Sequence, residues 1–110
     1  MHIINYLRQL SQIKSMKHEV FNSYVDKITQ LFSIDKETLF SKTKKREVVD
    51  ARHILYYVCS VRPMRISYIQ RYLEANGYSV QHTSILHGIR TIKKKITEDP
   101  DYVSIIRKLN

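Results

Sequence analysis

The sequence predicts an all-α protein, a small helical bundle that contains a helix-turn-helix. Apolar residues recur every three or four positions in several segments, which is typical of amphipathic helices. Only two glycines and two prolines occur among 110 residues that are 43% hydrophobic, a composition that favours a compact helical chain over a disordered or turn-rich one. Near the C-terminus a short helical segment, a Gly-containing turn and a basic helical segment follow one another, as in a helix-turn-helix.

Residues 1–17 are predicted to be a helical appendage, and residues 18–110 the main domain. The apolar residues of segment 2–14 have helical spacing and indicate either a helix docked on the bundle or an arm that pairs with another copy or another protein. We favour docking. Self-association or a protein partner held by this segment is the open alternative.

The first part of the main domain carries packing residues. A helix is predicted over residues 18–32, where a wide apolar stripe indicates a core face. Ser33 and Ile34 break the pattern, and Asp35 is a candidate N-cap for a short helical turn that runs through Leu39 and Phe40.

A basic connector at residues 41–46 precedes the most apolar helix, which is predicted over residues 47–61. A helix that is apolar on most sides is expected at the centre of the bundle. Arg52 and His53 interrupt it. Arg52 can pair with a carboxylate on its own helix or point at a phosphate, and His53 is interpreted as a satisfied, partly buried histidine because no metal-type residue lies at matching spacing.

Proline at position 63 ends this helix, and a short helix is predicted over residues 67–75. Asn76 and Gly77 then supply a turn, since both residue types tolerate left-handed backbone angles. The next helix, over residues 82–96, has an apolar stripe on one side. A last helix begins after Asp99, an N-cap that is followed by proline at the first helical position.

The polar side of the helix at residues 82–96 has the chemistry of a DNA recognition helix. Short hydrogen-bonding groups at its start (His82, Thr83, Ser84) suit base edges in a major groove, and the cations that follow suit phosphates. The alternative is a capped amphipathic helix with a solvated basic face.

Charge supports a polyanionic partner. The 19 Lys and Arg against 10 Asp and Glu give a net charge of +9, which favours nucleic acid first and an anionic membrane surface second. A single cysteine, Cys59, excludes an internal disulfide and a paired-cysteine zinc site. No segment approaches the roughly 18 apolar residues of a membrane span, and the N-terminus lacks the pattern of a signal peptide. We therefore expect a cytoplasmic protein that does not bind membranes.

Three motifs in order carry a family resemblance. They are the basic connector Ser41–Arg46, the run Ala51-Arg52-His53-Ile54, and the run Gln81-His82-Thr83-Ser84-Ile85-Leu86-His87 followed by Arg90. From about residue 18 to its end, the sequence resembles the C-terminal DNA-binding domain of the bacterial replication initiator DnaA.

The resemblance implies that the basic connector enters a minor groove while the helix from His82 reads an A·T-rich box in the major groove. The candidate base-reading residues are Gln81, His82, Thr83, Ser84 and His87. The candidate residues for the DNA backbone or minor groove are Lys42, Lys44, Lys45, Arg46, Arg52, Arg90, Lys93, Lys94 and Lys95.

Two departures from the family pattern qualify this expectation. Gln81 replaces an aspartate that is expected to contact a cytosine amino group and to cap the helix, so Ser79 becomes a candidate cap. Glu47 and Asp50 place negative charge where the family is neutral or basic. The phosphate-binding loop of the DnaA ATPase is also absent, so we expect a DNA-binding module that stands alone, without the ATPase domain.

The sequence therefore predicts sequence-specific binding of double-stranded DNA, with a nucleoid-associated role in regulating replication or transcription. The alternative is a protein-interaction module that kept the fold and uses its basic face on an acidic partner. We expect no enzyme activity, no metal and no cofactor, because the sequence shows neither a nucleophile–base pattern nor metal-ligand spacing.

Overall fold

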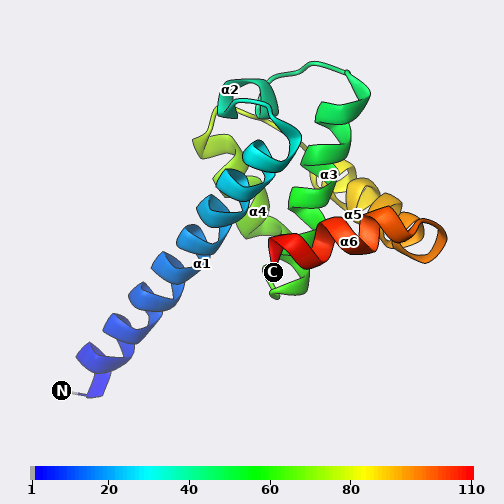
Figure 1. Cartoon of the computed structure of the whole chain (residues 1–110). Coiled ribbons are helices and arrows are strands. Elements are labelled where there is room, and N and C mark those ends of the chain that lie inside the picture. The colour runs from blue at the N-terminus through cyan, green and yellow to red at the C-terminus, as the bar shows by residue number, and fades with distance from the viewer. Residues whose placement is uncertain (1) are drawn as a thin grey trace.

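Six helices make up the protein in its computed structural model, which describes residues 2–110, with the side chains of residues 2, 4 and 6–15 outside the description. The helices are α1 (His2–Phe32), α2 (Lys36–Leu39), α3 (Arg46–Val61), α4 (Ile66–Ala75), α5 (His82–Glu98) and α6 (Pro100–Leu109). No strand occurs among the described residues, which confirms the all-α bundle (Figure 1).

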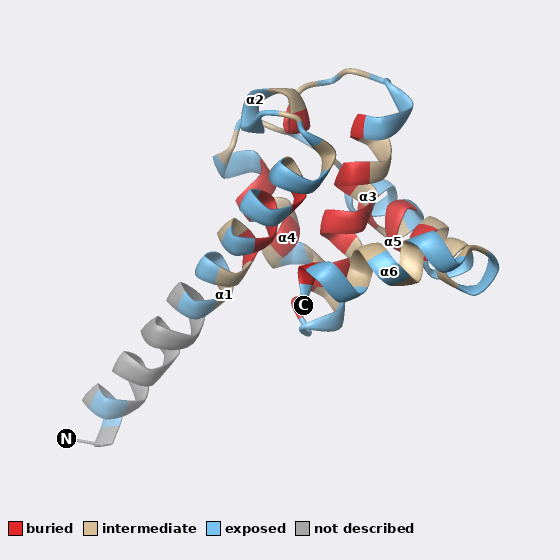
Figure 2. Ribbon diagram, in the orientation of Figure 1, coloured by how far each residue is buried: buried red, intermediate tan, exposed pale blue. Residues whose placement is uncertain are grey.

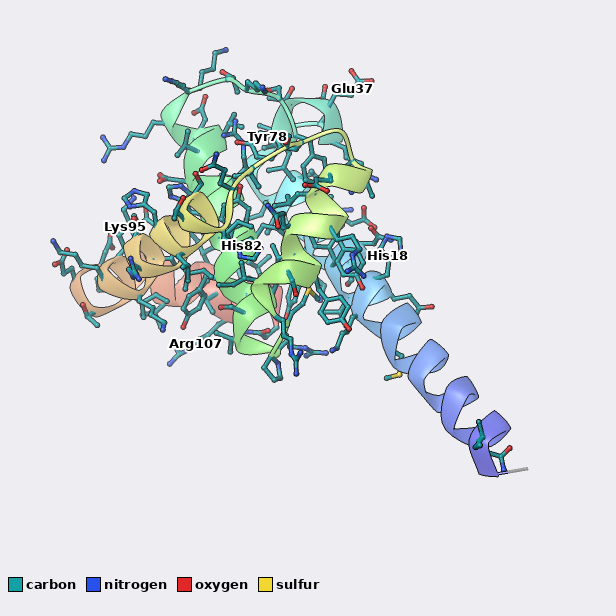
Figure 3. The ribbon with its side chains drawn as sticks, turned by 180° about the vertical axis from the view of Figure 1, so that it is seen from behind. His18, Glu37, Tyr78, His82, Lys95 and Arg107 are labelled. Atoms are coloured by element: carbon teal, nitrogen blue, oxygen red, sulfur yellow. The ribbon has the colours of Figure 1, made fainter. Side chains whose placement is uncertain are left out.

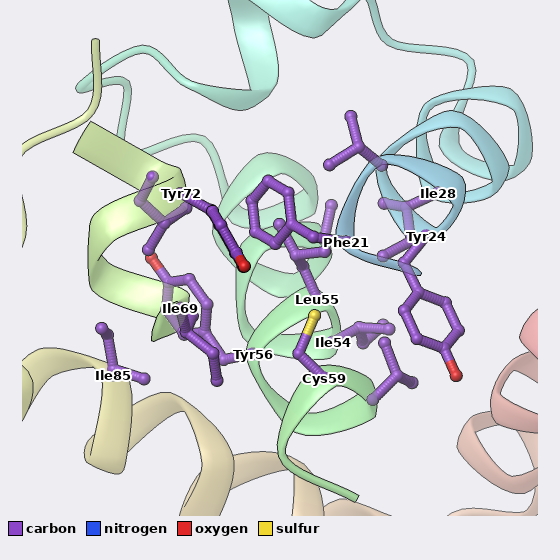
Figure 4. Packing of buried hydrophobic residues seen from close by; sticks show 14 of the residues in the cluster. Phe21, Tyr24, Ile28, Ile54, Leu55, Tyr56, Cys59, Ile69, Tyr72 and Ile85 are labelled. Atoms are coloured by element: carbon purple, nitrogen blue, oxygen red, sulfur yellow. The ribbon is translucent and has the colours of Figure 1, made fainter. Parts of the chain in front are cut away.

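Helix α3 lies at the centre, as its sequence predicts. Its residues Ile54, Leu55 and Cys59 are fully buried, and the other helices pack around it (Figure 2). Phe21 and Ile28 of α1 reach the same core from one side and Ile85 of α5 from another (Figure 4). Burial raises the pKa of the Cys59 thiol to about 12, so this cysteine is a buried apolar side chain rather than a reactive thiol.

Local capping signals set the helix ends. The Asp35 carboxylate accepts a hydrogen bond from the backbone N–H of Thr38 at 2.7 Å, and the Asp99 carboxylate accepts one from Asp101 at 2.9 Å. Both predicted N-caps are therefore confirmed. After α1, Ser33 adopts a φ of 54°, a left-handed conformation that ends the helix and lets Ile34 donate its N–H to the carbonyl of Thr29.

Helix α1 differs from the expected pair of N-terminal helices. It runs without a break from His2 to Phe32, because the residues between the two expected helices include no glycine or proline that would end it. Its first half extends away from the bundle, and the molecule measures 51 Å along its longest axis (Figure 1). The prediction that the N-terminal segment docks on the bundle is therefore wrong, because its backbone leads away from the other helices. The side chains of residues 6–15, which were expected to make the docking contacts, are outside the description.

Helices α4 and α5 and the six residues between them are consistent with the predicted helix-turn-helix. Gly77 has a φ of +80°, which glycine adopts without strain, and Tyr78 donates its N–H to the carbonyl of Leu73. These contacts turn the chain sharply after α4 and send α5 across α3. Within residues 2–110, no helix combines the length and the apolar composition needed to cross a bilayer.

Candidate nucleic-acid interface

The basic connector before α3 and the turn before α5 meet at one end of the molecule. Between them lies an open polar cleft of about 520 Å³. Its walls are Lys42, Thr43, Lys44, Arg52, Gln70, Glu74, Tyr78, Ser79, Val80, Gln81 and Ser84. Two segments that the sequence separates by about 30 residues, each singled out for DNA contact, therefore lie on the same side of the protein.

Arg52 on α3 makes hydrogen bonds to both of these segments. Its Nε donates to the carbonyl of Leu39 at 2.9 Å, its Nη2 to the carbonyl of Thr43 at 2.6 Å, and its Nη1 to the hydroxyl of Tyr78 at 3.2 Å. The guanidinium also lies 5.0 Å from the centre of the Tyr78 ring. One side chain thus ties together α2, the basic connector and the turn before α5.

This geometry corrects the expectation for Arg52. The residue is only 6% exposed, and each of its three guanidinium nitrogens donates to a protein oxygen. The acceptors do not include Glu47 or Asp50, the carboxylates on its own helix. The hydrogen bonds of the guanidinium are directed into the protein and not toward a phosphate. Arg52 therefore positions the basic connector and does not belong to the exposed cations.

The turn before α5 is held by a second polar contact. The Gln70 side-chain amide on α4 donates to the carbonyl of Val80 at 2.8 Å. Together with Tyr78, Gln70 fixes the residues that lead into α5. Sequence reasoning missed both residues, because a single Gln or Tyr has no local pattern that reveals a partner ten or more positions away.

The first turn of α5 is open to solvent. Gln81 occupies the N-cap position and its side chain makes no capping hydrogen bond, so the prediction of Ser79 as the N-cap is wrong. The first N–H groups of any helix lack carbonyl partners within the helix. Here they belong to residues whose side chains are exposed, namely His82, Thr83 and Ser84. Figure 3 shows His82 at the start of α5. The remaining candidate base-reading residues, Gln81 and His87, are also exposed.

The predicted backbone-contacting cations fall into two groups. Seven are exposed around the cleft and along α5: Lys42, Lys44, Lys45, Arg46, Arg90, Lys93 and Lys94. Lys95 differs, because its Nζ lies 3.0 Å from a carboxylate oxygen of Asp50 and donates to the hydroxyl of Tyr102 at 3.2 Å. Although partial burial opposes it, hydrogen bonding to Asp50 and Tyr102 raises the pKa of Lys95. Lys95 therefore pins α5 and α6 to α3.

Helix α5 packs tightly against α3 at Gly88. A Cβ built on Gly88 would lie 2.7 Å from Cδ2 of His53 and 2.9 Å from Cδ2 of Tyr56. Only glycine lets the two helices come this close without displacing an aromatic ring. The position of the exposed face of α5 thus depends on the absence of a side chain on its buried face.

His53 fills this contact, but the expectation that it is satisfied is wrong. Its Nδ1 is buried and has no hydrogen-bond partner among the described residues. Its ring meets that of His87 edge to face, with centroids 5.9 Å apart. Burial, followed by the nearby charges of His87, Lys95 and Arg52, lowers the pKa of His53, and only Asp50 opposes this. Among the described residues no group of three or more His, Cys, Asp or Glu side chains could hold a metal ion.

Fold and interface together define a small helical protein with a polar cleft, an uncapped exposed helix start and a surrounding set of cations. Comparison with curated proteins finds similarity to the chromosomal replication initiator protein DnaA of Flavobacterium psychrophilum, with 27% identity over 106 aligned residues. The alignment covers 89% of this chain but 20% of that protein, so the chain spans about one fifth of the length of this relative. The match supports the resemblance to the DNA-binding domain of DnaA.

No protein-family model matches the chain, and no solved structure matches it.

Proposed function

We propose that the protein binds double-stranded DNA sequence-specifically, with the start of α5 in the major groove and the basic connector along the adjacent backbone or minor groove. The observation that carries this proposal is the shared cleft, which brings Lys42 and Lys44 of the connector to Gln81 and Ser84 of α5. A DNA backbone that passes between two groove contacts needs such a polar, cation-lined passage. The similarity to DnaA supports the same partner.

Base reading is assigned to the exposed residues at the start of α5. Thr83 and Ser84 can donate to or accept from base edges, and the Thr83 methyl group can contact the methyl group of thymine. His82 and His87 present further polar edges on the same helix, and Gln81 can contact adenine through its amide. We propose A·T-rich sites like the DnaA box as targets.

Phosphate contact is assigned to the seven exposed cations, with Lys44, Lys45 or Arg46 in the minor-groove role. The uncapped N–H groups of α5 add a favourable place for a phosphate at the helix start. Arg52 and Lys95 are left out, because their charged groups already have partners inside the protein. Control of replication or transcription at such sites, in association with the nucleoid, is the proposed biological outcome.

The experiment is selection of bound duplexes from a random pool, followed by titration of an enriched and a random duplex with variants. Thr83→Ala should weaken binding to the enriched duplex by roughly fivefold to a hundredfold, the cost of 1 to 3 kcal/mol of base discrimination, and leave random DNA almost unchanged. Lys94→Ala should weaken both alike, because a phosphate contact carries no sequence information.

Lys108→Ala, which removes an exposed cation at the far end of α6, is the matched control. Equal losses on both duplexes for Thr83→Ala would show that α5 does not read bases. Failure to bind either duplex at low salt would favour a protein-interaction module with the same fold.

A further inference from the structure

A second surface lies at the opposite end of α3 from the basic connector. It is a groove of about 230 Å³ between α1 and the turn that joins α3 to α4, lined by Met16, Lys17, Val20, Arg62, Pro63 and Met64. The connector ends at Arg46, the first residue of α3, and the turn follows Val61, the last, so the length of this 16-residue helix separates the two surfaces. At 1.5 Å per residue that is about 24 Å.

The fold leaves apolar side chains exposed in the groove and on the residue that precedes its turn. Met16 is 61% exposed, and Val61, which immediately precedes Arg62, is 57% exposed. Met64 forms the buried floor at 5% exposure. Large apolar side chains that remain this exposed in or near a groove are typical of a protein-binding surface.

The walls of the groove are fixed before any partner arrives. On the turn side, Arg62 and Met64 both donate their N–H groups to the carbonyl of Cys59, at 3.2 and 2.9 Å. On the α1 side, His18 stacks on Tyr72 of α4 with ring centroids 4.8 Å apart, and the Lys17 ammonium lies 4.5 Å from the centre of the Tyr68 ring. A prearranged groove loses little conformational freedom on binding.

Charge selects the class of partner. Lys17 and Arg62 flank the apolar residues, and none of the described residues that line the groove is a carboxylate. A second copy of the chain is disfavoured, since each copy carries a net charge of +9. DNA would supply the negative charge but has no apolar group of the size needed to fill the groove. A helix with a row of apolar residues flanked by Asp and Glu would match both the apolar lining of the groove and its flanking cations, as in helix-in-groove recognition.

We propose that this groove binds an acidic amphipathic helix of another protein. An apolar side chain of the helix occupies the space between Met16, Val20 and Pro63, and its carboxylates pair with Lys17 and Arg62. The groove does not depend on the basic connector or α5, so its test needs no DNA.

The test is NMR titration of the isotope-labelled full chain with a synthetic helical peptide that carries a Leu row at i, i+3 and i+7 and is otherwise rich in Glu. Shifts should concentrate at Met16, Val20 and residues 61–64. Two comparison peptides separate the contribution of charge from that of apolar contact. One replaces Glu by Gln, and the other keeps the composition but scrambles the Leu positions. Each should bind about tenfold more weakly or worse.

Two double variants test the protein side. Met16→Ser/Val61→Ser removes the exposed apolar surface, and Lys17→Gln/Arg62→Gln removes the flanking charge, so each should weaken peptide binding about tenfold. Ile3→Ser, at an exposed apolar residue near the start of α1, and Lys36→Gln/Lys108→Gln are matched controls that should bind as the wild type does. Thermal unfolding of every variant shows whether weaker peptide binding comes from the altered groove or from loss of the folded structure.

Shifts confined to the basic connector and α5, or equal binding of the scrambled peptide, would overturn the proposal by showing simple attraction between opposite charges. No binding of the Glu-rich peptide would overturn it too, as would binding at the groove by anionic phospholipid vesicles alone. The proposed DNA binding would be unaffected by any of these results.

Discussion

At the scale of single residues, Arg52 shows that an arginine near a nucleic-acid interface can act without touching it. Arg52→Lys keeps the charge but cannot reproduce three directed hydrogen bonds from one planar group. Hydrogen bonds to charged groups contribute about 1.5 to 3 kcal/mol each, so we expect the free energy of unfolding to fall by about 2 kcal/mol. Urea unfolding followed by circular dichroism measures it.

Arg46→Lys, at an exposed cation of the same connector, is the control for Arg52→Lys and should cost less than about 0.5 kcal/mol. If the two substitutions were equally mild, the internal hydrogen bonds of Arg52 would not hold the connector. The side chain would then be free to serve as a phosphate contact after all.

His53 gives the protein a predictable response to acid. Because its pKa in the folded protein lies below the ordinary value of 6.5, the unfolded chain takes up a proton that the folded protein resists. Above about pH 6.5 the ring is neutral in both the folded and the unfolded state, so His53 does not lower the free energy of unfolding. As the pH falls from there toward the pKa of the folded state, the free energy of unfolding decreases. His53→Gln should remove this part of the loss.

The measurement is the free energy of unfolding at pH 7, 6 and 5 for the wild type and for His53→Gln. The wild type should lose more stability than the variant over this range. His82→Gln is the matched control for removal of one imidazole from the exposed face of the bundle. Parallel curves for wild type and His53→Gln would contradict the assignment of the response to His53.

At the scale of elements, the packing of α5 on α3 decides where the candidate base-reading face lies. Gly88→Ala gains about 1 kcal/mol of helix propensity. It also places a Cβ within 3 Å of His53 and Tyr56, and overpacking of this kind costs about 1 to 3 kcal/mol. Tyr56 is only 2% exposed and has little room to move. We expect a net loss of about 1 kcal/mol, measured by urea unfolding.

The double variant Gly88→Ala/His53→Ala tests the cause of this loss. Removal of the His53 ring should relieve part of the clash, so the two substitutions should cost less together than the sum of their separate costs. A stabilising effect of Gly88→Ala alone would show that α5 can move outward freely, and the close packing of the helices would then be unimportant.

Elements whose ends are set by neighbouring residues could be predicted from the sequence. Asp35 and Asp99 cap the helices that follow them, and the apolar surround of α3 places it at the centre, because capping and burial patterns act over a few residues. The unbroken α1 could not be predicted as readily, since the change in pattern between residues 14 and 18 resembles a helix boundary without containing a residue that ends a helix.

The sequence predicts which residues of the candidate interface are exposed, but it does not predict which buried residues hold them in position. Exposure of Thr83 or Lys94 follows from which side of an amphipathic helix it occupies. The most distant partner of Arg52 is Tyr78, 26 positions away, and that of Lys95 is Asp50, 45 positions away, so these contacts depend on the tertiary fold. A cation that binds DNA and a cation that binds the protein look the same in the sequence.

At the scale of the whole molecule, this division of the cations predicts the salt dependence of DNA binding. If about six phosphates are neutralised by the seven exposed cations, the logarithm of the binding constant should fall against the logarithm of salt concentration with a slope of about −5. Lys94→Ala should make the slope shallower by about 0.9, because one phosphate contact is lost.

Lys95→Ala provides the sharper test, because it removes the same charge from the neighbouring position. Lys95 already pairs with Asp50, so its removal should lower the free energy of unfolding and leave the salt slope within error of the wild type. Fluorescence anisotropy between 50 and 300 mM salt, at a temperature where both variants are folded, measures the slopes. Equal changes in slope for Lys94→Ala and Lys95→Ala would mean that DNA breaks the Asp50 pair, and that the fold does not determine which lysines of α5 contact phosphate.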